Sequence, residues 1–416
     1  MKKSPWLFFI IFVLCFFYSN LIRISGVVVL PALMDKLSIG AGMVGFLSSL
    51  FFYTYGASFA PWGAVLDRFG AFRACGAAML VAAAGAFMLM SAESALWVGI
   101  GRAVSGLGLS CAFSGVLIYS SSAFPKDSYP SLVSISFVVG HSGTVAAVAP
   151  LGVALDILGT GGVYLALGLF ALTLGALLLF FRNDDPECRK DKSTREPFSA
   201  MSLPANMKAG AKIVWRSFPL RVTALTWGVC AALMSTLQGL WAVTWLESAA
   251  GAAANDARAC ATWISAGMVV GPLIGGWVTK KARGGKVSFF VMCALTELAW
   301  LAWILATAFS VSLNLLAVIG FLIGLTAGAA MVFMGNATRD LSPEGYVGVV
   351  LGLVNTTIYL MVILFQWGTG LFIELLSDSL PGYPQLGYQA GFALLLVLQG
   401  YFFSLILKVK SFLPGE

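Results

Sequence analysis

Residues 7–33 read LFFIIFVLCFFYSNLIRISGVVVLPAL, an apolar stretch whose only charge is that of Arg23. A helix rises about 1.5 Å per residue, so roughly 20 apolar residues cross the hydrocarbon core of a bilayer. This stretch is long enough to do so. It is also too long and too uniformly apolar for a strand of a transmembrane barrel. The stretch therefore predicts a membrane-spanning helix.

Apolar blocks of similar length recur along the rest of the chain, at residues 43–62, 72–90, 95–120, 131–153, 163–181, 225–246, 261–278, 289–309, 313–334, 347–373 and 390–407. Of the 416 residues 59% are hydrophobic and 10% are charged, whereas a soluble domain has about 25% charged residues. We therefore predict an all-α membrane protein with twelve transmembrane helices, surrounded by a lipid bilayer.

The basic residues indicate the orientation of the chain. If the N-terminus is cytoplasmic, most of the 25 Lys and Arg residues fall in segments on the cytoplasmic side, and only Lys36 and Arg258 fall in external loops. This asymmetry predicts that both termini are cytoplasmic, as in a bacterial inner-membrane protein. The net charge of +7 is then explained by topology. No basic patch alternates with exposed aromatic residues, so the chain is not expected to bind nucleic acid.

Cysteine and histidine usage argues against several kinds of chemistry. The seven cysteines are scattered, no two form a CxxC pair, and the chain has one histidine. We therefore expect no disulfide framework, no metal site and no cofactor. No nucleophile–base pair is evident either, so the protein is not expected to be an enzyme.

A polar connector at residues 183–217 divides the apolar blocks into two sets of six. The predicted domains are an N-terminal half at 1–182, this cytoplasmic connector, and a C-terminal half at 218–416. Two loops support an internal repeat, GAVLDRFGAFR at 63–73 and GGWVTKKAR at 275–283. In each, a predicted helix end that contains glycine is followed by a short basic turn. Paired six-helix repeats are typical of one large class of transporters.

The first of these loops contains the pattern G-x-x-x-D-R-x-G-x-x-R, and the chain resembles the major facilitator superfamily over essentially its whole length. The resemblance implies two six-helix pseudo-repeats, a central site reached by alternating access, and a cytoplasmic gate formed by Gly63, Asp67, Arg68, Gly70 and Arg73. Thr279 stands where the second copy would need the acid, so the gate is assigned chiefly to the first.

Two further matches narrow the resemblance. Tyr18, Arg23 and Pro31 fit a helix 1 pattern similar to that of the organic-anion and phagosomal amino-acid transporter branches, and QGLW at 238–241 is similar to a stretch of the latter. GRAVSGLG at 101–108 resembles the R-x-x-x-G-x-G motif of helix 4.

Arg23 is the leading candidate for substrate binding. A charge inside a span is costly unless it faces protein or water, and a guanidinium can hold a carboxylate through two hydrogen bonds. Ser19 shares its helical face and Asn20 lies beside it. Arg102 in the fourth span is either a second anion-binding or coupling residue, or a structural residue that binds carbonyls of the first helix.

Two ionisable residues are candidates for proton coupling. His141 lies in the middle of the fifth span, where an imidazole can exchange protons near neutral pH. Glu297 is the one carboxylate well inside a span of the second half. Local hydrogen bonding is the alternative for both. Ile22 occupies the position of the acid that precedes the arginine in proton-coupled anion symporters, so facilitated diffusion and exchange remain open.

The second half offers two polar and aromatic stripes. Gln238 and Trp241 share a face of the seventh span, and Asn355 and Tyr359 share one of the eleventh. Such groups can orient a small ligand, or they can simply pack between helices. Packing, or a place at the membrane interface, is favoured for Trp245 and Gln366, which extend the two stripes.

These features predict a secondary active or facilitative transporter of a small organic anion or an amino-acid-like, carboxylate-bearing solute. The expected partners are an anionic or zwitterionic small molecule and, if transport is coupled, protons; the protein is expected to act as a monomer. A drug or metabolite efflux antiporter is the alternative function. It would favour a roomy apolar cavity with an acid for cations, whereas this chain carries arginines inside its spans.

Overall fold

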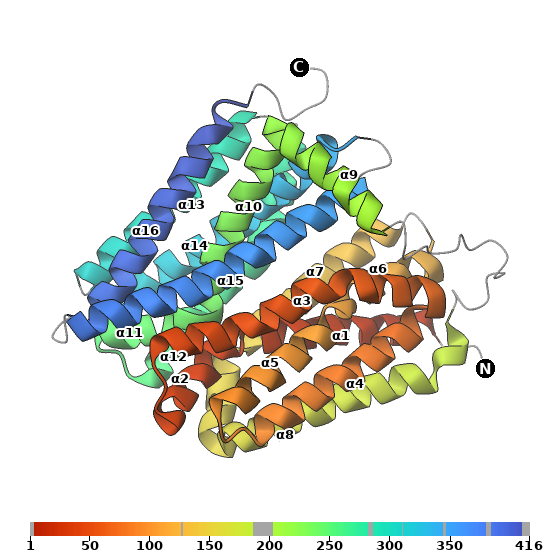
Figure 1. The fold of residues 1–416 in the computed structure, drawn as a ribbon, viewed down its shortest axis with the longest axis horizontal. Coiled ribbons are helices and arrows are strands. Elements are labelled where there is room, and N and C mark those ends of the chain that lie inside the picture. The colour runs from red at the N-terminus through yellow and green to blue at the C-terminus, as the bar shows by residue number, and fades with distance from the viewer. Residues whose placement is uncertain are drawn as a thin grey trace. The chain divides into compact units, whose positions relative to one another are not determined.

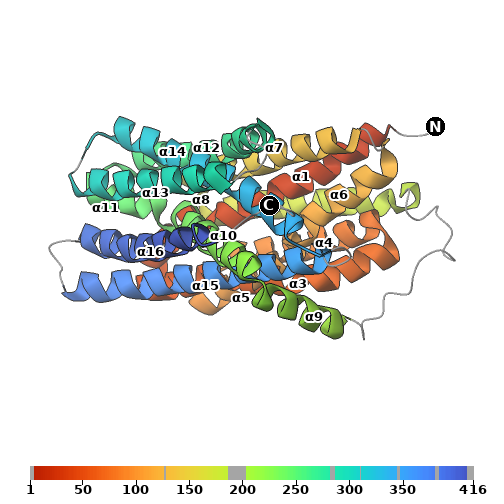
Figure 2. The ribbon, with the colours of Figure 1, turned by 90° about the horizontal axis from the view of Figure 1, so that it is seen from above.

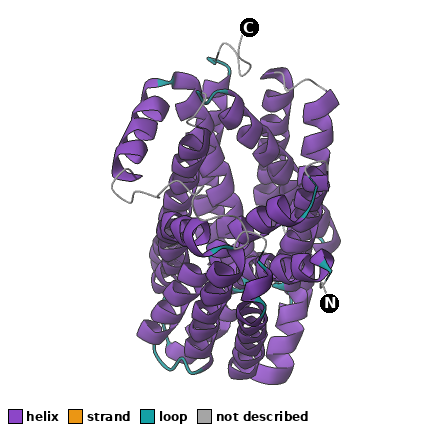
Figure 3. Ribbon diagram, turned by 90° about the vertical axis from the view of Figure 1, so that its right-hand side faces the viewer, coloured by secondary structure: helices purple, strands orange, loops and turns teal. Residues whose placement is uncertain are grey.

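The computed structural model describes residues 4–125, 128–185, 203–281, 286–309, 311–343, 347–379 and 384–409. Within these ranges every regular element is a helix (Figure 3). In the described part of the chain, ten helices are long and apolar enough to cross a membrane, and Ser131–Ala146 forms a shorter apolar helix. The predicted all-α membrane fold is therefore confirmed.

The first part of the chain forms α1 (Pro5–Ile24), α2 (Gly26–Leu37), α3 (Ala41–Phe69), α4 (Ala71–Met90), α5 (Ala95–Leu109), α6 (Cys111–Ala123), α7 (Tyr129–Ala146) and α8 (Ala149–Phe180). The second part forms α9 (Leu203–Arg216), α10 (Phe218–Thr236), a π-helical turn (Leu237–Trp241), α11 (Ala242–Ala250), α12 (Ala254–Lys281), α13 (Lys286–Ala308), α14 (Leu313–Asp340), α15 (Val347–Ser379) and α16 (Pro384–Ile406). Each predicted apolar block coincides, to within a residue at its end, with one of these helices or with consecutive ones; the block at 225–246 runs from α10 through the π-helical turn into α11.

The chain divides into two compact units. Unit 1 comprises Met1–Ser38 and Leu50–Ser199, and unit 2 comprises Ile39–Ser49 and Ala200–Glu416. The beginning of α3 thus groups with unit 2, whereas the sequence assigns it to the N-terminal half. The predicted domain boundaries stay a prediction.

In unit 1, α4 packs alongside α8 (Figure 1), and α1 packs against α7. Two of its predicted spans are interrupted, at Ser25 between α1 and α2 and at Ser110 between α5 and α6. A third break lies within α8 at Gly159, whose φ of 67° and ψ of 173° suit a residue without a Cβ. This break separates the fifth predicted span from the sixth.

In unit 2, α12 and α14 run side by side (Figure 2). Their close approach depends on glycine. A Cβ placed on Gly271 would lie 3.0 Å from the backbone nitrogen of Ala329, and one placed on Gly275 would lie 2.8 Å from the Cα of the same residue. Small residues at such crossings let membrane helices pack backbone against backbone.

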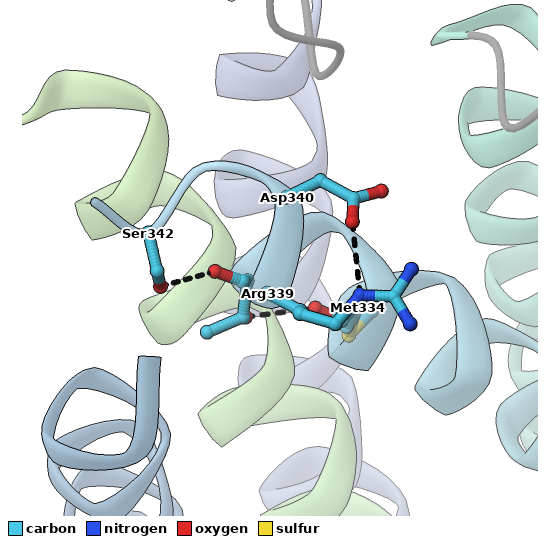
Figure 4. Close-up of polar contacts among 5 residues, drawn as sticks. Met334, Arg339, Asp340 and Ser342 are labelled. Atoms are coloured by element: carbon cyan, nitrogen blue, oxygen red, sulfur yellow. Dashed lines mark hydrogen bonds and ion pairs between the residues drawn. The ribbon is translucent and has the colours of Figure 1, made fainter. Parts of the chain in front are cut away.

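The end of α14 is closed by local polar contacts (Figure 4). The Ser342 hydroxyl donates to the carbonyl of Thr338, whose own hydroxyl donates to the carbonyl of Met334. Arg339 Nε lies 3.0 Å from Asp340 Oδ1, with 62% of the arginine side chain exposed. The bond from Ser342 takes up the carbonyl of Thr338, which lies in the last turn of α14, where a helix leaves carbonyl groups without helical partners.

Candidate functional site

The junction between α1 and α2 is held by side chains from two helices. The interruption at Ser25 leaves the carbonyl of Ile22 without a helical partner. That oxygen accepts hydrogen bonds from Ser25 Oγ at 2.9 Å and from Arg102 Nη1 at 3.3 Å. Arg102 is 1% exposed, and its guanidinium also lies 5.1 Å from the centre of the Phe51 ring. This geometry favours the structural interpretation of Arg102.

The junction between α5 and α6 is held in a reciprocal way. Ser19 on α1 donates to the carbonyl of Leu109 at 3.2 Å, next to the break at Ser110. The hydroxyl of Ser110 lies 2.7 Å from that of Ser58 on α3. The Ser19 hydroxyl therefore joins α1 to α5. It is buried, with an exposed fraction of 2%, which suits positioning better than substrate contact.

Arg23 is half-buried and is oriented by Asn20. Its Nη2 donates to Asn20 Oδ1 at 2.7 Å, while Asn20 Nδ2 donates to the carbonyl of Phe16 at 3.0 Å. Both ends of the buried amide are thus engaged, and the partner of the guanidinium is neutral. Among the described residues no acid forms an ion pair with Arg23. A guanidinium has five N–H donors, so most remain available for a ligand.

His141 on α7 interacts electrostatically with the guanidinium of Arg23 on α1. The imidazole stacks on Phe137, with ring centres 5.4 Å apart, and meets the edge of Phe16 at 5.5 Å. Its Nδ1 lies 3.0 Å from the carbonyl oxygen of Phe137, which can only accept, so Nδ1 carries the proton and Nε2 is left to accept one. A predicted substrate residue and a predicted coupling residue therefore lie together in unit 1.

The turn within the predicted gate motif depends on Gly70, whose φ is 83°. The next helix, α4, begins immediately after it, and its Phe72 amide donates to Asp185 Oδ2 at 3.1 Å. Asp185 is completely buried, although it lies at the start of the polar connector. Its role was not predicted from the sequence. The available signal was an acid four residues after the end of the sixth apolar block, because acids stabilise helix N-termini.

The other gate residues are spread along the end of α3 and the start of α4. Arg68 is exposed with its guanidinium 5.3 Å from the Phe69 ring centre, and Arg73 is also exposed. Gly63 has no atom within 4 Å of the position that a Cβ would take. The side chain of Asp67 lies outside the described part of the structure. The gating role of this motif stays a prediction.

In unit 2, Gln238 and Trp241 lie on the π-helical turn between α10 and α11. Gln238 Nε2 donates to Ser265 Oγ on α12 at 2.8 Å, and Trp241 Nε1 donates to Thr369 Oγ1 on α15 at 2.9 Å. Both side chains are buried, with exposed fractions of 4% and 1%. A π-turn inside a helix is rare and often marks a functional site. Here it directs two side chains to two neighbouring helices.

The side chains of the predicted stripe on α15 differ in how far they are exposed. Asn355 is exposed and Tyr359 is half-buried, whereas Gln366 is completely buried and donates to the carbonyl of Ser235 at 3.4 Å. Packing between helices therefore describes Gln366. The interfacial position considered for Trp245 is wrong, because this side chain is completely buried among Trp303, Tyr388 and Phe392.

Glu297 lies on α13 with both carboxylate oxygens buried. The carboxylate faces α16 at Gln399 and Gly400, and the thiol of Cys230 on α10 is within electrostatic reach. Glu297 is thus enclosed by three helices of unit 2. No group of His, Cys, Asp or Glu side chains suited to a metal ion occurs among the described residues.

Comparison with known proteins identifies the fold. Residues 7–366 match the model of the Major Facilitator Superfamily. None of the curated proteins compared matches the chain. Among the solved structures similar to it is a bacterial homologue of the human lysosomal transporter Spinster, inward-facing and unoccupied, with a TM-score of 0.75, 14% sequence identity and coverage of 98% of this chain and 96% of that one. A second structure of such a homologue, inward-facing and occupied, has a TM-score of 0.71, 15% identity and coverage of 98% of each chain. A D-xylose–proton symporter has a TM-score of 0.69, 12% identity and coverage of 96% of this chain and 98% of that one.

Proposed function

The chain belongs to the Major Facilitator Superfamily of membrane transporters, and we propose that its cargo is a small organic anion or an amino-acid-like solute bearing a carboxylate. The site in unit 1 would hold the carboxylate, and alternating access would carry it across the membrane. We further propose a monomer in a bacterial inner membrane with both termini in the cytoplasm, on the strength of the distribution of Lys and Arg.

The observation that supports this cargo is that Arg23 lies inside a span and has a neutral hydrogen-bond partner. Its guanidinium lies inside the first span, and a neutral amide 2.7 Å away orients it. A charge within a span costs at least a few kcal/mol, and the cost falls when an opposite charge approaches. A carboxylate is the natural partner because its two oxygens match the fork of the guanidinium.

The neighbouring residues then have distinct roles. Asn20 orients Arg23, while Ser19 and Arg102 fix the helix breaks on either side of it. Arg102 is thus proposed as a positioning residue rather than as a second ligand for the anion.

In unit 2 the candidates for substrate contact are Asn355 and Tyr359, because they are the more accessible members of the two stripes. An exposed amide within a span is costly in hydrocarbon and is expected to face water or a ligand. Gln238 and Trp241 are proposed to stabilise the π-turn through their hydrogen bonds to Ser265 and Thr369. They would contact the solute only if these bonds were broken and replaced by bonds to the solute.

Proton coupling is proposed for His141 in preference to Glu297. An anion bound at Arg23 adds negative charge beside the imidazole and so favours its protonated form, which links the binding of solute and proton. Glu297 is enclosed between α10, α13 and α16, where it has no comparable neighbour among the proposed substrate residues of unit 2.

Ligand-induced thermal stabilisation of the detergent-purified protein tests the proposal. A panel would contain carboxylates, amino acids, sulfonates, phosphates and lipophilic cations. A ligand present at 100 times its dissociation constant stabilises the folded state by about 2.7 kcal/mol. We expect a carboxylate-bearing hit that disappears in Arg23→Ala and survives in Arg258→Ala, which removes an arginine near an external loop. Stabilisation by lipophilic cations alone, unchanged in Arg23→Ala, would instead support the efflux antiporter.

A further inference from the structure

Helix α9, in the connector, presents a basic face. Lys208, Lys212 and Arg216 follow one another at intervals of four residues, so they lie on one side of the helix, and all three are exposed. The sequence of α9, LPANMKAGAKIVWR, contains no acid. A helix face that is merely solvated usually mixes charges of both signs. This one is uniformly positive.

The same face carries an exposed aromatic side chain. Trp215 is 70% exposed, and Phe218, just beyond the helix, is 38% exposed. The guanidinium of Arg221 lies 5.9 Å from the ring centre of Trp215 and 6.0 Å from that of Phe218. Cations beside a tryptophan are typical of the boundary between lipid headgroups and acyl chains, where the ring is partly buried and the charge stays hydrated.

The position of α9 within unit 2 fits such a boundary. It packs against α10 and α15 and runs across their ends instead of continuing along them (Figure 1). Gly210 is buried and Ile213 and Val214 are half-buried, so one side of α9 is held by the protein. Because α10 begins a membrane span, α9 lies where that span leaves the bilayer.

We propose that the face of α9 formed by Lys208, Lys212, Trp215 and Arg216, together with Arg221, binds anionic phospholipids of the membrane leaflet beside it. Each lysine or arginine at an anionic surface strengthens binding about fivefold, so the three cations on α9 strengthen it on the order of 100-fold together, apart from any contribution of Arg221. The tryptophan inserts among the headgroups and gives the face a fixed depth. The partner is thus a phosphatidylglycerol-like lipid surface.

Hydrogen–deuterium exchange of the full-length protein in nanodiscs tests this proposal at the helix itself. One set of nanodiscs contains phosphatidylcholine alone, and the other contains phosphatidylcholine with phosphatidylglycerol. We expect the backbone amides of residues 203–216 to exchange at least about tenfold more slowly in the anionic nanodiscs, because a docked helix opens less often. Equal exchange in the two lipids would overturn the proposal.

Three variants make the result specific. Replacing Lys208, Lys212 and Arg216 together by glutamine, which has a helix propensity similar to lysine, should abolish the difference between the two lipids. Lys208→Arg with Lys212→Arg should keep it, which shows that α9 still folds when substituted. A matched control, Lys2→Gln with Lys3→Gln and Lys408→Gln, removes three other cations and should keep it as well.

A difference that persists in the glutamine variant would overturn the proposal. So would equal protection by inorganic phosphate in phosphatidylcholine nanodiscs, which would point to a soluble anion.

Discussion

The guanidinium of Arg102 donates a hydrogen bond to the backbone carbonyl of Ile22, 3.3 Å away, at the point where the first membrane span is interrupted. The next residue along the chain is Arg23. Arg102 therefore fixes the backbone from which the proposed anion-binding side chain projects. In the proposed function the two arginines therefore act in series: Arg102 holds the main chain, and Arg23 is proposed to bind the ligand.

Replacing Arg102 by methionine should destabilise the protein. The substitution removes a charged hydrogen bond to a buried carbonyl, an interaction worth about 1.5–3 kcal/mol. Thermal unfolding in detergent should show a lower midpoint for Arg102→Met than for Arg258→Met, which alters an arginine close to the start of α12. An unchanged midpoint would mean that the bond to Ile22 contributes nothing to the fold.

Asn20→Asp should weaken binding of the anionic solute at least tenfold. The new carboxylate would lie at the position of Asn20 Oδ1, 2.7 Å from the Arg23 guanidinium, and would neutralise it. Asn20→Ala is the matched control, because it removes the orienting amide but leaves the positive charge. Titration calorimetry with the best ligand should show a much larger loss for the aspartate. Equal losses would mean that Asn20 matters through packing rather than through the charge of Arg23.

Much of the fold follows from the sequence because hydrocarbon imposes strong constraints. Every apolar block lies on helix, as the need to satisfy backbone hydrogen bonds in a bilayer requires. The same constraint singles out Arg23, because a charge inside a span is costly unless it faces protein or water. These inferences need only the length and polarity of a segment, which a sequence shows directly.

The details of the site could not be predicted because they depend on breaks in the helices. The π-turn at Leu237–Trp241 shifts the phase of the seventh span, so helical spacing did not show that Gln238 and Trp241 donate to two neighbouring helices. The breaks at Ser25 and Ser110 likewise have no proline or glycine at the residue itself. Serine can bond to a nearby carbonyl and so compete with the helix, but it often does so without breaking it.

The hydrogen bond between Trp241 and Thr369 should show measurable coupling. Trp241→Phe and Thr369→Val each remove one partner of the 2.9 Å bond, and the cycle subtracts the cost of the smaller phenylalanine ring because it occurs with either residue at 369. A double-mutant cycle on the free energy of unfolding should give a coupling of about 0.5–1.5 kcal/mol. A coupling near zero would show that these two side chains pack together without a bond that stabilises the π-turn.

His141 and Glu297 should differ in their effect on proton-driven accumulation. In proteoliposomes with an imposed pH gradient, His141→Gln should lose accumulation of the solute while exchange of solute against solute persists, because binding at Arg23 remains possible. Glu297→Gln should retain accumulation, since its carboxylate faces Gln399 and Gly400 rather than the site around Arg23. The reverse result would move the coupling site to Glu297. Accumulation retained by both variants would exclude both residues and leave proton coupling without support.

The crossing of α12 and α14 provides a test with a control on the same helix. A Cβ on Gly271 would lie 3.0 Å from both the backbone nitrogen of Ala329 and the Cα of Gly328, so Gly271→Ala must push the two helices apart. Overpacking of this kind costs about 1–3 kcal/mol.

Gly276, a little more than one turn further along α12, has no atom within 4 Å of its would-be Cβ. Gly276→Ala should therefore be neutral, or gain up to about 1 kcal/mol from the better helix propensity of alanine. Thermal unfolding of the two variants in the same detergent should order them as Gly271→Ala below wild type and Gly276→Ala at or above it. If Gly271→Ala unfolded at the wild-type temperature, α12 and α14 could not lie as close together as the structure places them.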